Sequence, residues 1–175
     1  MAIKQTTQVG DPIIRAKAKT VKDVNSSVVK KIVGNLVDSM RKHNLVGMAA
    51  PQIGESWRIF VTEIRKTKYR KDTELDELRV FINPQITASS KKKTVGWEGC
   101  GSVAEAGLFA KVKRPATVVV EALDENGEKF SLRSKGLLSA VIQHEIDHLN
   151  GVLFIDRADI TTCMSRKEYL KMRTK

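Results

Sequence analysis

The run Gln143-His144-Glu145-Ile146-Asp147-His148-Leu149 decides most of what this chain can be. Positions i and i+4 of an α-helix lie on one face, so His144 and His148 can direct two imidazole nitrogens at one divalent metal ion. Glu145 can reach a water on that metal but is turned away from the ligand pair, which suits a general base. A lone histidine on an apolar helix face is more often a packed core residue. This chain has only three histidines, however, and two of them in a His-Glu-x-x-His frame favour the metal interpretation.

The residues before this motif continue the same helix. The segment from Gly136 to Gln143 reads GLLSAVIQ, and its apolar residues extend the helical pattern upstream. We therefore expect a buried helix that holds the ligands rigidly. Asp147 would project away from the metal, so we expect it to form an ion pair or a helix-supporting hydrogen bond rather than to take part in catalysis.

A catalytic site of this kind normally has three protein ligands and leaves one position for water. The other His and Cys side chains are His43, Cys100 and Cys163. Cys100 is the strongest candidate, because glycines on both sides of it allow the close backbone approach that a tight metal loop needs. Cys163 lacks such a context and is expected to be a small packed side chain. His43 is expected near a helix end, where a cation is favourable.

The chain resembles the peptide deformylase family in three separate segments that occur in the family's order. Two of them are Gly47-Met48-Ala49-Ala50-Pro51-Gln52 and Glu98-Gly99-Cys100-Gly101-Ser102, and the third is the histidine segment. The similarity extends from Val9 to about Asp156. It implies an α+β fold in which antiparallel β-sheets surround a central metal-bearing helix.

The resemblance also implies a role for each matching residue. Glu145 would be the general acid/base that acts on a metal-activated water. Gln52 and the backbone N–H of Gly101 would hydrogen-bond the formyl oxygen as it becomes an oxyanion. Gln52 could instead be only a polar turn residue after Pro51. The implied metal ligands are Cys100, His144 and His148.

The family removes formate from the N-formylmethionine of new polypeptides, so the implied partners are N-formylmethionyl peptides. The positions implied to bind substrate are Leu45, Val46, Gly47, Glu98, Leu137 and Val141. Those that are apolar could equally serve ordinary core packing. The general chemistry of a Cys-His-His site suits zinc, whereas the resemblance implies Fe²⁺, with Zn²⁺, Ni²⁺ or Co²⁺ able to substitute.

Three residues depart from the family's pattern. Leu45 stands where a glycine is usual, Gly101 where a leucine is usual, and Ala104 where a proline is common. We expect the change at Gly101 to remove an apolar pocket wall and to free the loop, altering rate or acyl preference more than metal chemistry. One alternative is therefore an amidohydrolase of the same fold that acts on another N-acyl group or on a peptide bond. Another is a ribosome-associated binding protein with a structural metal, although Glu145 and Gln52 would then have no use.

Composition and length agree with one compact domain over residues 1–175. The chain is 41% hydrophobic and has no long linker, so it can bury a sizeable core. No apolar run approaches the roughly 18 residues that span a bilayer, and the first residues lack the apolar region of a signal peptide. With only two cysteines, a disulfide scaffold is not expected. We expect a monomer in the cytoplasm, with no membrane partner.

The formal net charge of +11 predicts attraction to polyanions, although a solvated surface is the default for lysine clusters. The ribosome is the natural polyanion for this family. We therefore expect docking through the basic surface and a basic C-terminal helix at about residues 162–175.

Elsewhere the pattern is of mixed α and β elements. Apolar residues at helical spacing predict a helix over residues 26–43, and strands are predicted at 57–63 and 79–83. Asn126-Gly127 predicts a hairpin between strands at 117–123 and 128–132. The basic segment 65–72 is expected to be an exposed loop between strands.

Overall fold

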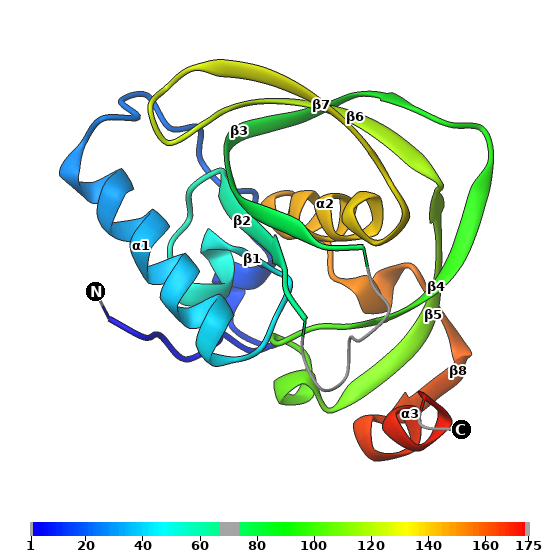
Figure 1. Ribbon diagram of the computed structural model, residues 1–175. Coiled ribbons are helices and arrows are strands. Elements are labelled where there is room, and N and C mark those ends of the chain that lie inside the picture. Colours follow the sequence, from blue (N-terminus) through cyan, green and yellow to red (C-terminus); the bar gives the residue numbers. More distant parts are fainter. Residues whose placement is uncertain (1, 67–73, 174–175) are drawn as a thin grey trace.

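The computed structural model describes residues 2–66 and 74–173, and its elements surround one central helix. That helix is α2 (Gly136–Leu149), which the strands enclose in Figure 1. Helix α1 (Ser27–Lys42) covers one flank, and α3 (Arg166–Arg173) lies at the opposite corner of the molecule (Figure 1). The short 3-10 helices are η1 (Pro12–Arg15), η2 (Ala50–Ile53), η3 (Ala104–Ala106) and η4 (Phe154–Asp156).

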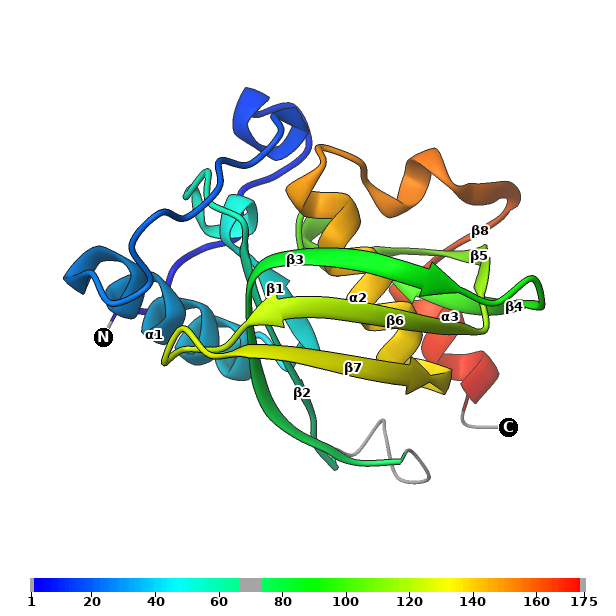
Figure 2. The ribbon, with the colours of Figure 1, turned by 90° about the horizontal axis from the view of Figure 1, so that it is seen from above.

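Two antiparallel sheets enclose α2, as the resemblance implied. The larger has the order β1-β2-β3-β6-β7, and β3, β6 and β7 run side by side across α2 in Figure 2. Its strands are β1 (Gly47–Ala49), β2 (Ile59–Ile64), β3 (Asp76–Ser89), β6 (Thr117–Leu123) and β7 (Lys129–Lys135). The smaller sheet has the order β4-β5-β8. Its strands are β4 (Lys93–Gly99), β5 (Leu108–Pro115) and β8 (Ala158–Ser165).

Helix α1 confirms the prediction for residues 26–43 almost to the residue. The side chain of Ser26 caps its N-terminus by accepting a hydrogen bond from the Val29 N–H, and His43 is its C-terminal cap. The stripe of apolar residues faces the large sheet and is buried there. It consists of Val29, Ile32, Leu36, Val37 and Met40.

The predicted hairpin is present, with the strand at 117–123 as predicted and the strand after the turn extended to Lys135. Gly127 has φ of +83°, a conformation that glycine adopts without strain, and the strands around it pair from Leu123 and Lys129 to Thr117 and Lys135. The strands predicted at 57–63 and 79–83 correspond to β2 and to the middle of β3. The loop expected at 65–72 falls mostly on residues 67–73, outside the described residues.

The C-terminal helix begins later than predicted. Residues 162–165 belong to β8, which pairs with β5, so α3 starts only at Arg166. Its Tyr169 ring stacks on Phe109 of β5, with ring centroids 4.1 Å apart. This contact holds α3 against the smaller sheet.

Buried apolar side chains fill the space between α2 and the two sheets. Phe60 and Phe81 of the large sheet stack with centroids 4.4 Å apart and pack in one cluster with Ile142 and Ile146 of α2. A separate cluster beside the smaller sheet contains Cys100, with Cys163 packed partly buried against it. Among the helices of the described ranges, none is long and apolar enough to cross a bilayer.

Candidate metal centre

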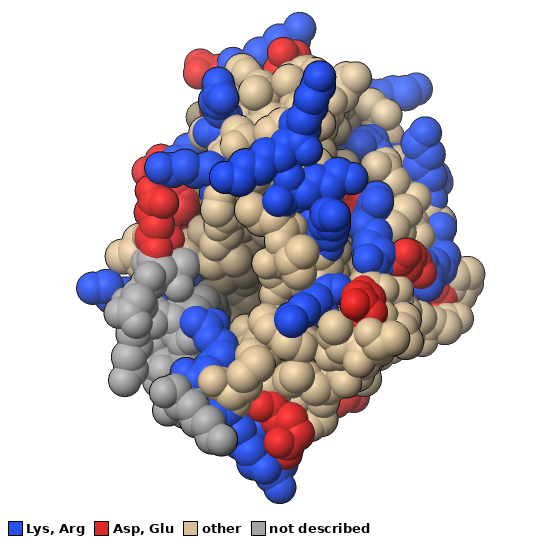
Figure 3. All heavy atoms as spheres, turned by 90° about the vertical axis from the view of Figure 1, so that its right-hand side faces the viewer, with Lys and Arg blue, Asp and Glu red and all other residues tan. Residues whose placement is uncertain are grey.

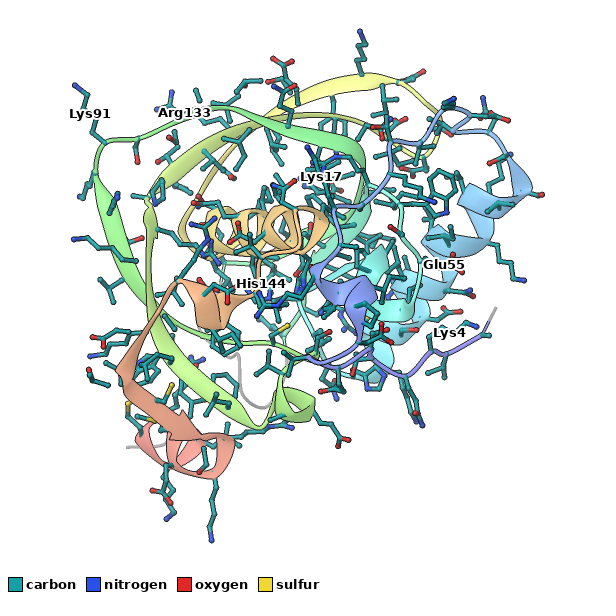
Figure 4. All side chains as sticks on the ribbon, turned by 180° about the vertical axis from the view of Figure 1, so that it is seen from behind. Lys4, Lys17, Glu55, Lys91, Arg133 and His144 are labelled. Carbon is teal, nitrogen blue, oxygen red and sulfur yellow. The ribbon has the colours of Figure 1, made fainter. Side chains whose placement is uncertain are left out.

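Helix α2 and the end of β4 bring three ligand-type side chains together. His144 and His148 project from one face of α2, and Cys100 directly follows β4. One potential ligand atom from each lies within 4.8 Å of the others, and the Cys100 Sγ is 3.1 Å from Nε2 of His148. Figure 4 shows His144 near the middle of the molecule, below the axis of α2.

Glu98 and Arg114 hold His144 from behind. Oε2 of Glu98 lies 2.9 Å from Nδ1 of His144, which leaves Nε2 of that ring to face the cluster. Arg114 donates two further hydrogen bonds to the same carboxylate, at 2.6 and 2.9 Å. Burial raises the pKa of Glu98, but the hydrogen bonds from His144 and Arg114 outweigh it and lower the pKa to about 2. Glu98 was predicted to bind substrate. In the structure both of its carboxylate oxygens are instead hydrogen-bonded, to Arg114 and His144.

Asp147 forms the ion pairs expected of it, and it joins the same network. It accepts a hydrogen bond of 2.8 Å from Arg114 and two of 2.7 Å from Arg157. Arg114 therefore bridges Asp147 on α2 to Glu98 on β4. Arg114 ends the basic run Lys111–Arg114, and a run of this kind gives no sign of burial in the sequence, whereas only 5% of Arg114 is exposed.

Glu145 is buried beside the cluster with one oxygen lacking a partner. Only 3% of Glu145 is exposed, and its Oε2 makes no hydrogen bond with the described residues. Burial raises the pKa of this carboxyl to about 7, against the opposing influence of His144 and His148. A Cβ atom on Gly47 would lie 2.5 Å from Oε1 of Glu145, so the strand beside the carboxyl needs glycine.

Gln52 presents its amide nitrogen to the cysteine loop. Its Oε1 accepts a hydrogen bond of 2.8 Å from the Ala49 N–H, which fixes the amide orientation. Nε2 then lies 3.6 Å from the Cys100 Sγ and 3.4 Å from Oγ of Ser102. The side chain is buried and points into the site, which a solvated turn residue would not do.

The donor set fits a divalent metal ion. Burial raises the pKa of the Cys100 thiol, but His148 and His144 beside it lower the pKa well below its usual range, which favours the thiolate. Within the described ranges, Oε2 of Glu145 and Nδ1 of His148 are buried without partners. One thiolate and two imidazoles are ligands that zinc and iron accept.

The residues predicted to bind substrate fall into separate places. Val141 lies against Gly47, since a Cβ on that glycine would be 2.7 Å from its Cγ1, and Leu137 is 38% exposed one turn earlier on α2. The carbonyl of Val46 accepts a hydrogen bond from the Glu63 N–H. Leu45 lines a different cavity of about 400 Å³ next to the cysteine loop. Its walls are Gln5, Thr6, Gln8, His43, Leu45, Gly101, Glu105, Ala106 and Arg166.

The loop at Gly101 is not freed as the sequence suggested. A Cβ atom there would lie 3.3 Å from Cδ1 of Leu45 and 3.3 Å from Cγ2 of Thr6. Leu45 therefore supplies the apolar wall that glycine lacks. The Gly101 carbonyl also accepts hydrogen bonds from the side chains of Thr6 and Gln8. No local sequence signal marks these two residues, because their partners are more than 90 positions away.

Comparison with known proteins agrees with this geometry. The model of the polypeptide deformylase family matches residues 3–163. The chain belongs to the peptide deformylase family. A peptide deformylase of Natranaerobius thermophilus is 38% identical over 159 residues, which are 91% of this chain and 94% of the relative. One of Dictyoglomus thermophilum is 40% identical over 156 residues, covering 89% of this chain and 93% of the relative.

The fold of the family is shared as well. The crystal structure of the class I type b peptide deformylase of Acinetobacter baumannii with Met-Ala-Ser bound superposes with a TM-score of 0.84 at 30% identity. The match covers 89% of this chain and 98% of that one. Peptide deformylases use a divalent metal, for which Cys100, His144 and His148 form the metal-binding group in this chain.

Proposed function

We propose that this enzyme removes the formyl group from N-formylmethionine at the start of polypeptides, with Glu145 as the general acid/base. The observation that carries the assignment of Glu145 is its buried carboxyl, with one oxygen unpartnered, beside the Cys-His-His cluster. A purely structural metal site has no use for such a group. The pKa of about 7 lets Glu145 both accept and release a proton near neutral pH.

Each residue has one task in the proposed reaction. A divalent ion bound by the cluster supplies Lewis-acid chemistry and lowers the pKa of water towards about 7. Glu145 accepts the proton of the attacking water and delivers it to the amine, which must leave protonated because an amide anion is a very poor leaving group. Gln52 Nε2 and the Gly101 N–H donate hydrogen bonds to the formyl oxygen as its negative charge develops.

The proposed substrate is the peptide N-terminus with its methionine side chain packed near Gly47 and Val141. The Met-Ala-Ser bound to the Acinetobacter baumannii enzyme supports a peptide ligand. Val46, and Leu137 at the exposed end of α2, would form the outer part of this pocket. Leu45 would line the adjoining cavity instead.

Fe²⁺ is the proposed physiological ion, with Zn²⁺, Ni²⁺ or Co²⁺ able to replace it. The mixed thiolate and imidazole donors support an ion of this group over Mg²⁺ or Ca²⁺, which prefer oxygen. Elemental analysis after anaerobic purification tests the assignment. Stoichiometric zinc together with little iron would contradict it.

The decisive experiment is formate release from formyl-Met-Ala-Ser by anaerobically prepared, Fe²⁺-loaded protein. We expect release from wild type, and a loss of about 10² to 10⁴-fold in Glu145→Gln with its metal retained. Acetyl-Met-Ala-Ser and longer acyl peptides serve as competitors. A preference for any of them would favour the alternative amidohydrolase, and unchanged hydrolysis by Glu145→Gln would refute the mechanism.

The proposal also includes docking on the ribosome. The docking protein would be a monomer in the cytoplasm. Figure 3 shows Lys and Arg side chains gathered on the face that carries the smaller sheet. The exposed lysines on this face lie in β4, in β5 and in the turn before β4. They are Lys91, Lys92, Lys93, Lys111 and Lys113. Lys91 points outward at the edge of the molecule in Figure 4. Such a surface suits the phosphates of RNA.

The contribution of α3 can be tested by ending the chain before Leu170. The shortened chain keeps Tyr169, the residue whose ring stacks on Phe109. We expect weaker ribosome binding with unchanged deformylation of free peptide. Equal ribosome binding by the full-length and shortened chains would remove α3 from the proposal.

A further inference from the structure

The N-terminal segment Thr6–Val9 is tied to both segments that carry the proposed oxyanion donors. The Thr7 N–H donates a hydrogen bond of 2.8 Å to the carbonyl of Gln52. Two residues later, the Val9 N–H donates one of 2.8 Å to the carbonyl of Ser102. Gln52 lies in η2 and Ser102 in the cysteine loop, so this segment spans the gap between the two donors.

Side chains of the same segment hold the carbonyl of Gly101, which restrains this glycine from the peptide that follows the one carrying its N–H. The Thr6 hydroxyl donates to the Gly101 carbonyl at 3.0 Å, and Nε2 of Gln8 donates to it at 2.9 Å. Gln8 also donates to the Thr6 hydroxyl at 2.9 Å, which directs that hydroxyl proton towards Gly101. The side chains of Leu45 and Thr6 both lie where a Cβ atom of Gly101 would point, each 3.3 Å from that position.

Gln8 reaches a second wall of the adjoining cavity. Its Oε1 accepts a hydrogen bond of 3.1 Å from the Glu105 N–H. Ala104, Glu105 and Ala106 have φ of +47°, +51° and +61°, and such a run of left-handed residues without glycine is strained. The amide of Gln8 therefore ties this strained turn to the carbonyl of Gly101.

We propose that Gln8, acting with Thr6, is a positioning residue that orients the Gly101 N–H towards the formyl oxygen. The inference rests on the proposed function. Glycine has wide conformational freedom, whereas an oxyanion donor must be oriented before the charge develops. An error of about 1 Å in such a group can lower the rate about 10²-fold. In this chain the restraint on Gly101 comes from outside the loop.

The test compares four variants by kcat and KM for formyl-Met-Ala-Ser and by metal content. Gln8→Ala removes the amide, and Thr6→Val removes the hydroxyl while keeping the side-chain shape. We expect kcat to fall about tenfold in both, with KM within about twofold and full metal content, because the donor acts mainly on the transition state. Thr6→Ser keeps the hydroxyl and should match wild type. Gln85→Ala, at an exposed glutamine on β3, is the control for loss of a side-chain amide.

A second measurement follows the Gly101 amide without using catalysis. Hydrogen exchange of the ¹⁵N-labelled Gly101 N–H should be faster in Gln8→Ala and Thr6→Val than in wild type, Thr6→Ser or Gln85→Ala. Unchanged exchange with unchanged kcat would overturn the proposal. Loss of metal or a rise in KM that accounts for the whole defect would also overturn it, since those show a structural role. If wild type released no formate, the proposed function would fail, and the exchange result would still decide whether Gln8 orients Gly101.

Discussion

Oε2 of Glu98 lies 2.9 Å from Nδ1 of His144, and the two side chains come from different layers of the molecule. Glu98 belongs to β4 and His144 to α2. The carboxylate fixes which imidazole nitrogen carries the proton and which one faces the cluster. Because Arg114 holds the carboxylate in turn, the direction of a proposed metal ligand depends on a buried network that extends to Asp147.

Replacing this carboxylate should weaken metal binding. In Glu98→Gln we expect affinity for Zn²⁺ to fall by about tenfold or more, since the partner that orients His144 loses its charge. Competition with a coloured chelator measures the affinity. Glu121→Gln, at an exposed glutamate on β6, should bind zinc as wild type does. Equal affinities for all three proteins would contradict the role given to Glu98.

Protonation of Glu98 should make the metal-free protein less stable in acid. The pKa of Glu98 is lowered from 4.5 to about 2 in the folded protein. Its contribution to the free energy of unfolding is therefore complete above pH 4.5 and is lost as the pH falls towards about 2. Urea unfolding of chelator-treated protein across this window should show a steeper loss in wild type and Glu121→Gln than in Glu98→Gln. Parallel curves would show that the network does not depend on the charge of Glu98.

Gly47 should be required for catalysis for a steric reason. The new methyl group of Gly47→Ala would lie 2.5 Å from Oε1 of Glu145 and must displace that carboxyl. We expect kcat to fall about 10²-fold, because a shift of about 1 Å in a reacting group costs that much. Gly96→Ala is the matched control, since its methyl group on β4 would meet no atom within 4 Å. Wild-type turnover by Gly47→Ala would refute the placement of Glu145.

Asp147→Asn should destabilise the fold more than loss of an exposed ion pair. The change removes the charge that faces Arg114, whose side chain is only 6% exposed. Arg114 keeps its two hydrogen bonds to Glu98, so its charge retains a partner, and we expect the free energy of unfolding to fall by about 1–3 kcal/mol. Glu168→Gln breaks the exposed contact with Lys171 and should cost under about 1 kcal/mol. Urea unfolding compares the two, and similar losses would show that the pairs of Asp147 add little.

The sequence was sufficient where the signal is local. The stripe of α1, the hairpin at Asn126-Gly127 and the two histidines on α2 all depend on spacings of a few residues, and the structure confirms each. Strands β1, β4, β5 and β8 were not predicted. In β4 only Val95 and Trp97 are large and apolar, and both point to the lysine-bearing face, so no buried stripe marks the strand.

The surroundings of the site could not be read from the sequence, because they depend on distant pairs. Glu98 is separated from His144 by 46 positions, and Gln8 from Gly101 by 93. From the sequence alone, the departure at Gly101 therefore predicts a loss of restraint. Its compensation by Leu45, Thr6 and Gln8 becomes visible only when the chain is folded.

The ligand residues are also widely spaced along the chain, with Cys100 and His148 separated by 48 positions. During synthesis the cysteine leaves the ribosomal tunnel while the helix that carries both histidines has yet to emerge. The complete ligand set therefore forms only after most of the polypeptide is outside the tunnel. Tight binding of the ion would therefore report that the smaller sheet and the central helix have docked.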